Sequence, residues 1–230
     1  KNQRKGHIAF VKKDDKLISE ELKLNKFNSK IIKVDTKKSD SLLKKICNDY
    51  FLLETSKENL SFILEISKRL NFKKILLVKA IQNFKGLKYR QQIIFKNNFL
   101  TIINDSKSTS LASSIGALKA KSKIFWLLGG IHKRGDQFKL SKKYFKNINA
   151  YIYGSSKTFF KKKLKGKIKY KNFDNLENAF KEVFEIVKKN KSISKTILFS
   201  PSAASFDSFN NFEDRGYYFN KLVKKYLNGK

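Results

Sequence analysis

The stretch ILFSPSAASFDSFNNFEDRG, from Ile197 to Gly216, combines features that do not belong to one kind of element. It begins as an apolar strand and turns at Ser200-Pro201, where the chain has its only proline. Small polar residues and three phenylalanines follow. Three phenylalanines are unusual in a surface turn, and so many serines and asparagines are unusual in a core strand. The pattern predicts a strand end followed by a loop that holds a small ligand.

The rest of the chain alternates between strand and helix patterns. Strands are predicted at His7–Val11, Ser29–Val34, on both sides of Asn97-Asn98, and at Lys123–Leu128, Ala150–Gly154, Lys167–Lys171 and Thr196–Phe199. Helices are predicted at Ser56–Asn71, Lys73–Phe84, Ser110–Lys119, Lys142–Ile148, Ser156–Leu164 and Leu176–Lys189, with a last helix that ends near Leu227. This alternation predicts an α/β fold with a mostly parallel sheet and helices on both faces. The best domain boundary is Gly86, which gives domains 1–86 and 87–230.

Composition limits the class of protein. Hydrophobic residues make up 40% of the 230 residues, which is enough for a core, and no apolar run approaches a membrane span. The single cysteine, Cys47, excludes an internal disulfide and fits a reducing compartment, so we expect a cytoplasmic protein without membrane contact. With two histidines and no CxxC motif, a structural zinc site is disfavoured.

The net charge of +33 raises the question of nucleic-acid binding. Only five of the 52 basic residues are arginines, although arginine is the residue that reads phosphate and guanine with two hydrogen bonds. The lysines are also spread along the whole chain. A basic nucleic-acid-binding module therefore stays open as an alternative, but the sequence favours a different function.

Three predicted strands are followed by residues that can bind a ligand. The segments are IINDSKST (Ile102–Thr109), WLLGGIHKRGD (Trp126–Asp136) and the loop that begins at Ser200. In parallel sheets ligands bind beyond the carboxyl ends of the strands, so the three segments should converge. Together they offer a carboxylate, lysines, hydroxyls and aromatic walls. This set suits a small anionic ligand that carries an amine or a hydroxyl.

The three segments, in this order, resemble the Mur ligase family of peptidoglycan synthesis, and within it the ligases that add D-glutamate. NFKGLKYR (Asn83–Arg90) resembles the family's hinge into its C-terminal domain, with Lys88-Tyr89 where Pro-His is usual. SKENLSFILEISKRLN (Ser56–Asn71) resembles a helix that follows a His-Asn pair, here Thr55-Ser56. The resemblance covers essentially the whole chain and is densest after Gly86.

The resemblance implies that residues 1–86 are the tail of a P-loop-type central ATPase domain and that residues 87–230 are a Rossmann-like C-terminal domain. The chain has no GxxxxGK[ST] phosphate loop, and it begins at Lys1 without a methionine, so it reads as a piece of a longer protein. The family's magnesium ligands would precede Lys1, and none is expected in this chain. We therefore expect the chain to be inactive alone.

The implied reaction joins D-glutamate to UDP-N-acetylmuramoyl-L-alanine through an acyl phosphate, with ATP and Mg²⁺, in an enzyme that is a monomer at full length. Three sets of residues carry the implied roles. Lys107 would be catalytic. The amino-acid substrate would be bound by Thr109, Lys133, Ser205, Phe206 and Phe212. ATP would be bound by Asn59, Arg90 and Asp105.

Each assignment leaves a simpler alternative. Arg90 and Lys133 can be solvated charges, Asp105 and Thr109 can cap helices, and the phenylalanines can be core residues. Arg215 is expected to pair weakly with Glu213 or Asp214 at the surface. Another Mur ligase or a folylpolyglutamate-type ligase would share the fold and the use of ATP.

Overall fold

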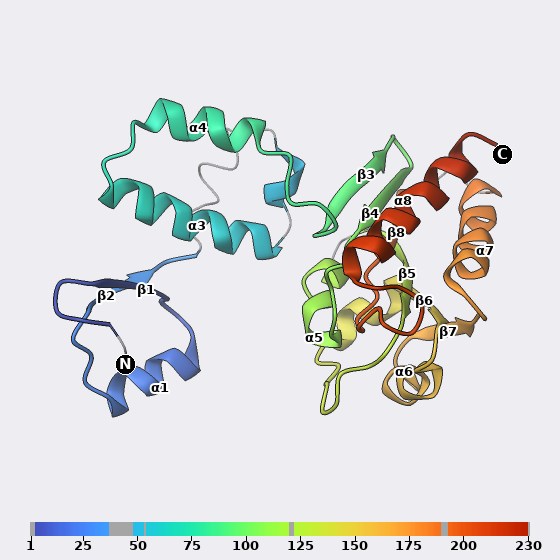
Figure 1. Cartoon of the computed structure of the whole chain (residues 1–230), viewed down its shortest axis with the longest axis horizontal. Coiled ribbons are helices and arrows are strands. Elements are labelled where there is room, and N and C mark those ends of the chain that lie inside the picture. Colours follow the sequence, from blue (N-terminus) through green and yellow to red (C-terminus); the bar gives the residue numbers. More distant parts are fainter. Residues whose placement is uncertain (1–2, 37–47, 53, 120–121, 190–192, 230) are drawn as a thin grey trace. The chain divides into compact units, whose positions relative to one another are not determined.

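The computed structural model describes residues 3–36, 48–52, 54–119, 122–189 and 193–229. The chain divides into two compact units, Lys1–Lys85 and Gly86–Lys230 (Figure 1). We call them unit 1 and unit 2. Their assignment to the central and C-terminal domains of Mur ligases stays a prediction.

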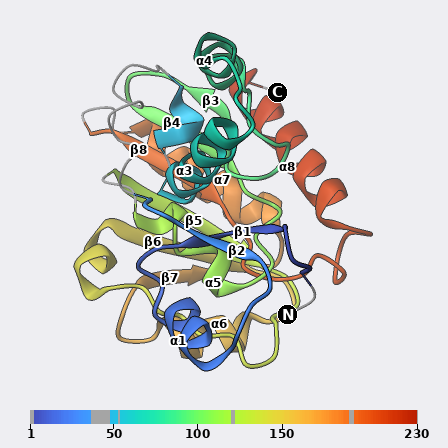
Figure 2. The same ribbon diagram turned by 90° about the vertical axis from the view of Figure 1, so that its left-hand side faces the viewer.

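Unit 1 begins with a βαβ element. Strands β1 (Ile8–Lys12) and β2 (Lys30–Val34) pair in parallel, and helix α1 (Lys16–Leu24) connects them (Figure 2). Both strands were predicted, whereas α1 was not. Asp15 explains its start, because the Asp15 carboxylate accepts a hydrogen bond from the Ile18 backbone N–H.

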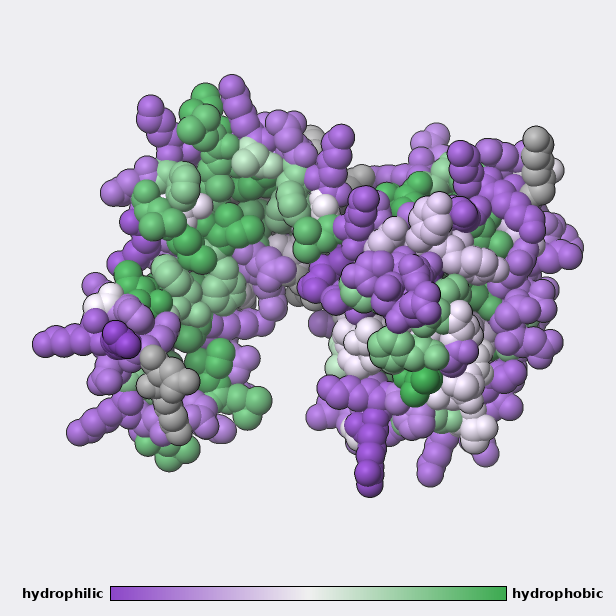
Figure 3. Space-filling model, viewed as in Figure 1, coloured by the Kyte–Doolittle hydropathy of each residue, from purple (hydrophilic) through white to green (hydrophobic). Residues whose placement is uncertain are grey.

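Residues 48–52 and 54–83 of unit 1 are mainly helical. A 3₁₀ helix (Asp49–Leu52) precedes α3 (Glu54–Arg69) and α4 (Lys74–Asn83), and the small core contains Phe51, Leu60 and Ile81. Several large apolar side chains remain exposed, and Figure 3 shows an apolar surface over these helices. They are Ile63, Ile66, Leu70, Phe72, Ile75, Leu76 and Phe84.

Unit 2 is built on a six-stranded sheet with the order β3-β4-β8-β5-β6-β7. Its strands are β3 (Gln92–Lys96), β4 (Leu100–Asn104), β5 (Lys123–Gly129), β6 (Ile148–Tyr153), β7 (Lys169–Asn172) and β8 (Lys195–Phe199). The first pair is antiparallel, as expected for a hairpin at Asn97-Asn98, and the other pairs are parallel. The predicted α/β fold with a mostly parallel sheet is confirmed.

Helices cover both faces of this sheet, as predicted. Residues of α7 (Leu176–Lys189) and α8 (Phe212–Leu227) pack on one face (Figure 1). Residues of α5 (Leu111–Ser114) and α6 (Lys157–Leu164) pack on the other. The central strand β5 is buried on both sides after Lys123, which explains its continuous apolar sequence IFWLLG.

Two predicted helices differ from expectation. The segment Ser110–Lys119 contains only the short α5 and a 3₁₀ turn (Ala117–Lys119), since Gly116 lies between them and Ser113 and Ser114 hydrogen-bond to other serines. The segment near Lys142–Ile148 is a 3₁₀ helix (Lys142–Asn147). Among the described residues, no helix is both long and apolar enough to cross a membrane.

Candidate functional site

Three loops of unit 2 meet at the carboxyl ends of the parallel strands. Backbone hydrogen bonds join them: the Asp105 N–H donates to the Phe199 carbonyl (2.7 Å), and the Gly129 N–H donates to the Pro201 carbonyl (2.9 Å). Ile131 and Ala204 exchange two further bonds, of 2.9 and 2.8 Å. The convergence predicted from the sequence is therefore present. We call the loops 105–110, 129–136 and 200–211 the strand-end loops.

The Gly-Gly turn is needed because the loops approach closely. A Cβ on Gly129 would lie 2.3 Å from the Tyr153 carbonyl oxygen, and one on Gly130 would lie 2.2 Å from the Ala204 carbonyl oxygen. Neither distance is compatible with a side chain. Gly130 also has φ of +125°, which L-residues rarely adopt. Gly130 thus allows the loops 129–136 and 200–211 to lie against each other, and Gly129 allows a close approach to Tyr153 at the end of β6.

Lys107 and Phe212, both predicted site residues, lie together. The Lys107 ammonium is 3.8 Å from the centre of the Phe212 ring, a cation–π contact. Lys107 is exposed and Phe212 is half-buried. Thr109 is also exposed, and it does not cap the next helix, because Ser110 accepts the capping bond from the Ser113 N–H. The ammonium and the Thr109 hydroxyl are therefore available at the surface of the loop.

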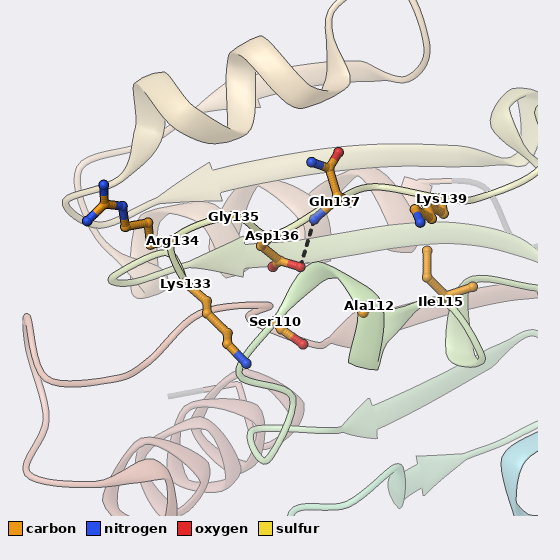
Figure 4. A pocket seen from close by; sticks show the side chains of 9 residues that line it. All are labelled: Ser110, Ala112, Ile115, Lys133, Arg134, Gly135, Asp136, Gln137 and Lys139. Atoms are coloured by element: carbon orange, nitrogen blue, oxygen red, sulfur yellow. Dashed lines mark hydrogen bonds between the residues drawn. The ribbon is translucent and has the colours of Figure 1, made fainter. Parts of the chain in front are cut away.

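Lys133 lines a pocket of about 440 Å³ between α5 and the loop 129–136 (Figure 4). In Figure 4 its side chain extends toward the loop that carries Ser110, whereas Arg134 points away. The buried Asp136 fixes this loop, since its carboxylate accepts hydrogen bonds from the backbone N–H groups of Leu111 and Gln137. The pocket is also lined by Ala112, Ile115, Gly135 and Lys139.

Ser205 and Phe206 sit in the turn after the loop's contact with Ile131. Ser205 is buried, and its carbonyl accepts bonds from the N–H groups of Ser208 and Phe209. Phe206 is 70% exposed, so it is not a core residue of this structure. An aromatic ring left in solvent beside a polar loop suits contact with a ligand or another part of the protein. The substrate-binding role of both residues stays a prediction.

Asp105 points inward. Its carboxylate accepts hydrogen bonds from the Gln91 N–H (3.1 Å) and the Ser200 hydroxyl (2.8 Å), and it is almost fully buried. Burial raises the pKa of Asp105 to about 7, although the two hydrogen bonds and the nearby Arg90 oppose this shift. Arg90 itself is exposed. In this arrangement the Asp105 carboxylate connects Gln91, before β3, to Ser200, after β8. A direct contact of Asp105 with a nucleotide would require its side chain to change rotamer.

A chain of hydrogen-bonded serine hydroxyls continues from Asp105, and no sequence pattern predicted it. Ser200 contacts Ser114 (2.7 Å), and Ser114 contacts Ser202 and Ser108 (2.5 and 2.7 Å). All four serines are buried. Their order in the sequence shows no periodicity, so only the fold brings them together. The network fixes the positions of the loops 105–110 and 200–211 relative to α5.

Arg215 corrects an expectation. The sequence suggested a weak surface pair with Glu213 or Asp214, but the guanidinium is buried, with 1% exposure, and it bonds to Ser106 instead. The helix explains the difference. Glu213 and Asp214 precede Arg215 in the first turn of α8 and are exposed, while Arg215 faces the sheet.

Asn59 lies in unit 1. It is exposed on α3 and lines an apolar pocket of about 310 Å³. The other lining residues are Tyr50, Phe51, Ile63, Leu77, Ala80, Ile81 and Phe84. An apolar, aromatic pocket with one amide is suited to a flat heteroaromatic ring. Among the described residues, no group of three or more His, Cys, Asp or Glu side chains could hold a metal ion.

Comparison with known proteins gives a consistent result. No family model matches the chain. It is 36% identical over 170 residues to a UDP-N-acetylmuramoylalanine–D-glutamate ligase of Rickettsia felis, a match that covers 74% of the chain and 38% of that protein. The corresponding ligases of Wolbachia sp. subsp. Brugia malayi and Francisella tularensis subsp. tularensis are 35% and 37% identical over 173 and 176 residues. Those matches cover 75% and 74% of the chain, and 34% and 41% of the two proteins.

Solved structures share the fold. UDP-N-acetylmuramate-alanine ligase MurC of Thermotoga maritima superimposes with a TM-score of 0.54 at 16% identity, over 77% of the chain and 39% of that protein. MurF of Acinetobacter baumannii superimposes with a TM-score of 0.51 at 18% identity, over 75% of the chain and 38% of that protein. The chain spans about two fifths of the length of these relatives. The sequence matches and the shared fold together show that the chain belongs to the Mur ligase family.

Proposed function

We propose that unit 2 is the amino-acid-binding part of a ligase that joins D-glutamate to UDP-N-acetylmuramoyl-L-alanine. The observation that carries this proposal is the meeting of the three strand-end loops at one edge of a parallel sheet. They bring an exposed ammonium with its aromatic neighbour, Lys107 and Phe212, near to the loop of Lys133. The sequence relatives support the choice of D-glutamate, because all three are named for it.

The chemistry of the loops suits a dicarboxylic amino acid. Lys107, Thr109 and Lys133 offer two cations and a hydroxyl. The buried Asp136 carboxylate in the pocket of Lys133 accepts hydrogen bonds from two backbone N–H groups. Charge-assisted hydrogen bonds from such groups would orient the two carboxylates of D-glutamate and leave its amine free to attack. Ser205 and Phe206 would close the distal side, and Phe212 would cover the aliphatic part. Lys107 would also stabilise negative charge that develops at the reacting carbonyl.

ATP would activate the carboxylate of the UDP-linked substrate as an acyl phosphate. Of the residues in this chain, Asn59 fits a nucleotide base best, because its amide stands at the rim of an apolar pocket. Arg90 is exposed and could meet a phosphate. Magnesium ligands and the phosphate loop would come from the part of the relatives that this chain does not match. We place the reaction in the cytoplasm and expect the chain alone to be inactive.

A chimera tests the proposal. In the Rickettsia felis ligase, the matched segment is replaced by its 170-residue counterpart from this chain, and phosphate release is measured. Lys133→Ala should raise the KM for D-glutamate by about ten- to a hundredfold, since the loss of a charged hydrogen bond costs about 1.5–3 kcal/mol. The KM for ATP should not change. Lys162→Ala, which removes an exposed lysine from α6, is the control. An unchanged KM for D-glutamate in the Lys133 variant would remove Lys133 from the site.

A further inference from the structure

Arg215 makes an unusual set of contacts for a charged side chain. It is among the largest fully buried side chains of the described residues. Its Nε donates a hydrogen bond to the Ser106 hydroxyl (3.1 Å), and its Nη2 donates one to the Ser106 carbonyl (2.8 Å). Both acceptors belong to one residue, so the planar guanidinium holds the loop 105–110 at Ser106 through two hydrogen bonds.

Ser106 also connects Arg215 to the start of α8 through a further hydrogen bond. Its hydroxyl donates to the Phe212 carbonyl (2.8 Å) while it accepts from Arg215. A second link lies beside it, because the Asn104 side-chain amide donates to the Gly216 carbonyl (2.8 Å). The loop after β4 is thus attached to the first turn of α8, although more than a hundred residues separate them in the sequence.

The guanidinium also lies close to the loop 129–136. A Cβ on Gly130 would be 3.2 Å from Nη1 of Arg215. One side chain of α8 therefore reaches two of the three strand-end loops, 105–110 and 129–136. Burial of an arginine is costly, and Nη1 of Arg215 has no hydrogen-bond partner among the described residues, whereas an exposed pair with Glu213 or Asp214 was available next to it. The buried position of Arg215 is explained if the guanidinium holds the loops 105–110 and 129–136 in place.

The residues placed by these bonds are among those that would face the substrate under the proposed function. Lys107 directly follows Ser106, and Phe212 lies one helical turn before Arg215. Their cation–π contact of 3.8 Å connects the loop 105–110 to the start of α8 at the protein surface. The buried Arg215 side chain connects the same two segments in the interior. We infer that Arg215 is a positioning residue of the candidate site: from inside the protein it sets the position of Lys107 against Phe212. Its meaning for catalysis rests on the proposed function, but its geometry does not.

Nuclear magnetic resonance of the 230-residue chain tests this inference without any ligand. The ring of Phe212 should displace the ε-methylene proton signals of Lys107 upfield from those of the exposed lysines. Lys107→Gln identifies these signals by their loss, and Phe212→Leu gives their position without the ring. Arg215→Gln should return them to that unshifted position. Arg215→Lys should do the same, because one ammonium cannot reproduce the two bonds to Ser106. Lys224→Gln, an exposed change on the same helix, should leave them shifted.

Ser106→Ala guards against a variant that does not fold. It removes the hydroxyl that links Arg215 to Phe212 and leaves the guanidinium in place. Fluorescence of Trp126, the only tryptophan and a buried residue of unit 2, shows which variants are folded. If Ser106→Ala and every folded Arg215 variant keep the shifted Lys107 signals, the inference is wrong. In the chimera, Ser106→Ala should also raise the KM for D-glutamate and not that for ATP. A displaced Lys107 with an unchanged KM for D-glutamate would refute the substrate-binding role of this pair and leave the positioning intact.

Discussion

Gly130→Ala is the substitution whose effect follows most directly from the geometry of the strand-end loops. The new Cβ would lie 2.2 Å from the Ala204 carbonyl oxygen and 3.2 Å from both Ala203 Cβ and the Arg215 guanidinium. The carbonyl belongs to the backbone, which is tied to Ile131 by two hydrogen bonds, so it cannot move away alone. The variant must shift the loop 200–211 or lose these bonds.

The magnitude has two parts. A residue held at φ of +125° costs about 1–3 kcal/mol, and the added methyl group in a packed site costs about 1–3 kcal/mol more. We expect unit 2 to lose about 2–6 kcal/mol of its free energy of unfolding. Gly166→Ala is the matched control in the same unit. Its φ is +71° and nothing lies within 4 Å of its Cβ, so only the backbone term of about 1–2 kcal/mol applies.

Urea unfolding followed by the fluorescence of Trp126 measures this difference, because the indole is fully buried in β5 and reports on unit 2. With a slope of about 2 kcal/mol per molar urea, a difference of 2 kcal/mol moves the midpoint by about 1 M. If Gly130→Ala is no more destabilising than Gly166→Ala, the loops do not pack as described.

Three further predictions concern stability. Burial raises the pKa of Asp105 to about 7 from an ordinary value of 3.8, so between these pH values the folded state holds a proton that the unfolded chain has released. The free energy of unfolding should therefore fall as pH rises from about 4 to 7. Asp105→Asn should flatten this pH dependence and stabilise unit 2 at pH 8 by roughly 2–4 kcal/mol. Urea titrations between pH 4 and 8 that give the same pH dependence for both proteins would contradict this prediction. Tyr153→Phe should change stability by less than about 1 kcal/mol, because the buried hydroxyl has no hydrogen-bond partner among the residues that the structure describes, and a loss above about 2 kcal/mol would reveal one. A chain that starts at Leu87 should melt cooperatively, with coincident circular dichroism and fluorescence transitions, since unit 2 has its own two core clusters, and a broad transition would speak against this boundary.

The fold of unit 2 was largely predictable, because its strands and helices carry clear periodicity. Within β5, Ile124–Leu128 is apolar throughout, as a strand buried on both faces requires. The parallel arrangement then implied that the segments after β4, β5 and β8 share one edge of the sheet. The break in the helix Ser110–Lys119 could not be read in this way, since it depends on hydroxyl contacts with Ser108, Ser200 and Ser202.

The role of the candidate site residues stays a prediction, but the meeting of their loops could be read from the sequence. Lys107, Thr109 and Lys133 were proposed because polar side chains follow strand ends. Arg215 was placed at the surface, since two acidic neighbours in sequence make a surface pair plausible. Its contact with Ser106 crosses more than a hundred residues, and no local pattern encodes it. Such long-range polar contacts require the folded structure.

The proposed function requires that the strand-end loops bind D-glutamate for ligation. The most direct test is the choice of amino acid by the chimera with the Rickettsia felis ligase. Phosphate release would be measured with ATP, Mg²⁺ and UDP-N-acetylmuramoyl-L-alanine, adding D-glutamate, L-glutamate, L-alanine or meso-diaminopimelate in turn. Our account predicts release with D-glutamate and with none of the other three. A folded chimera that is silent with D-glutamate but active with one of the others would contradict it.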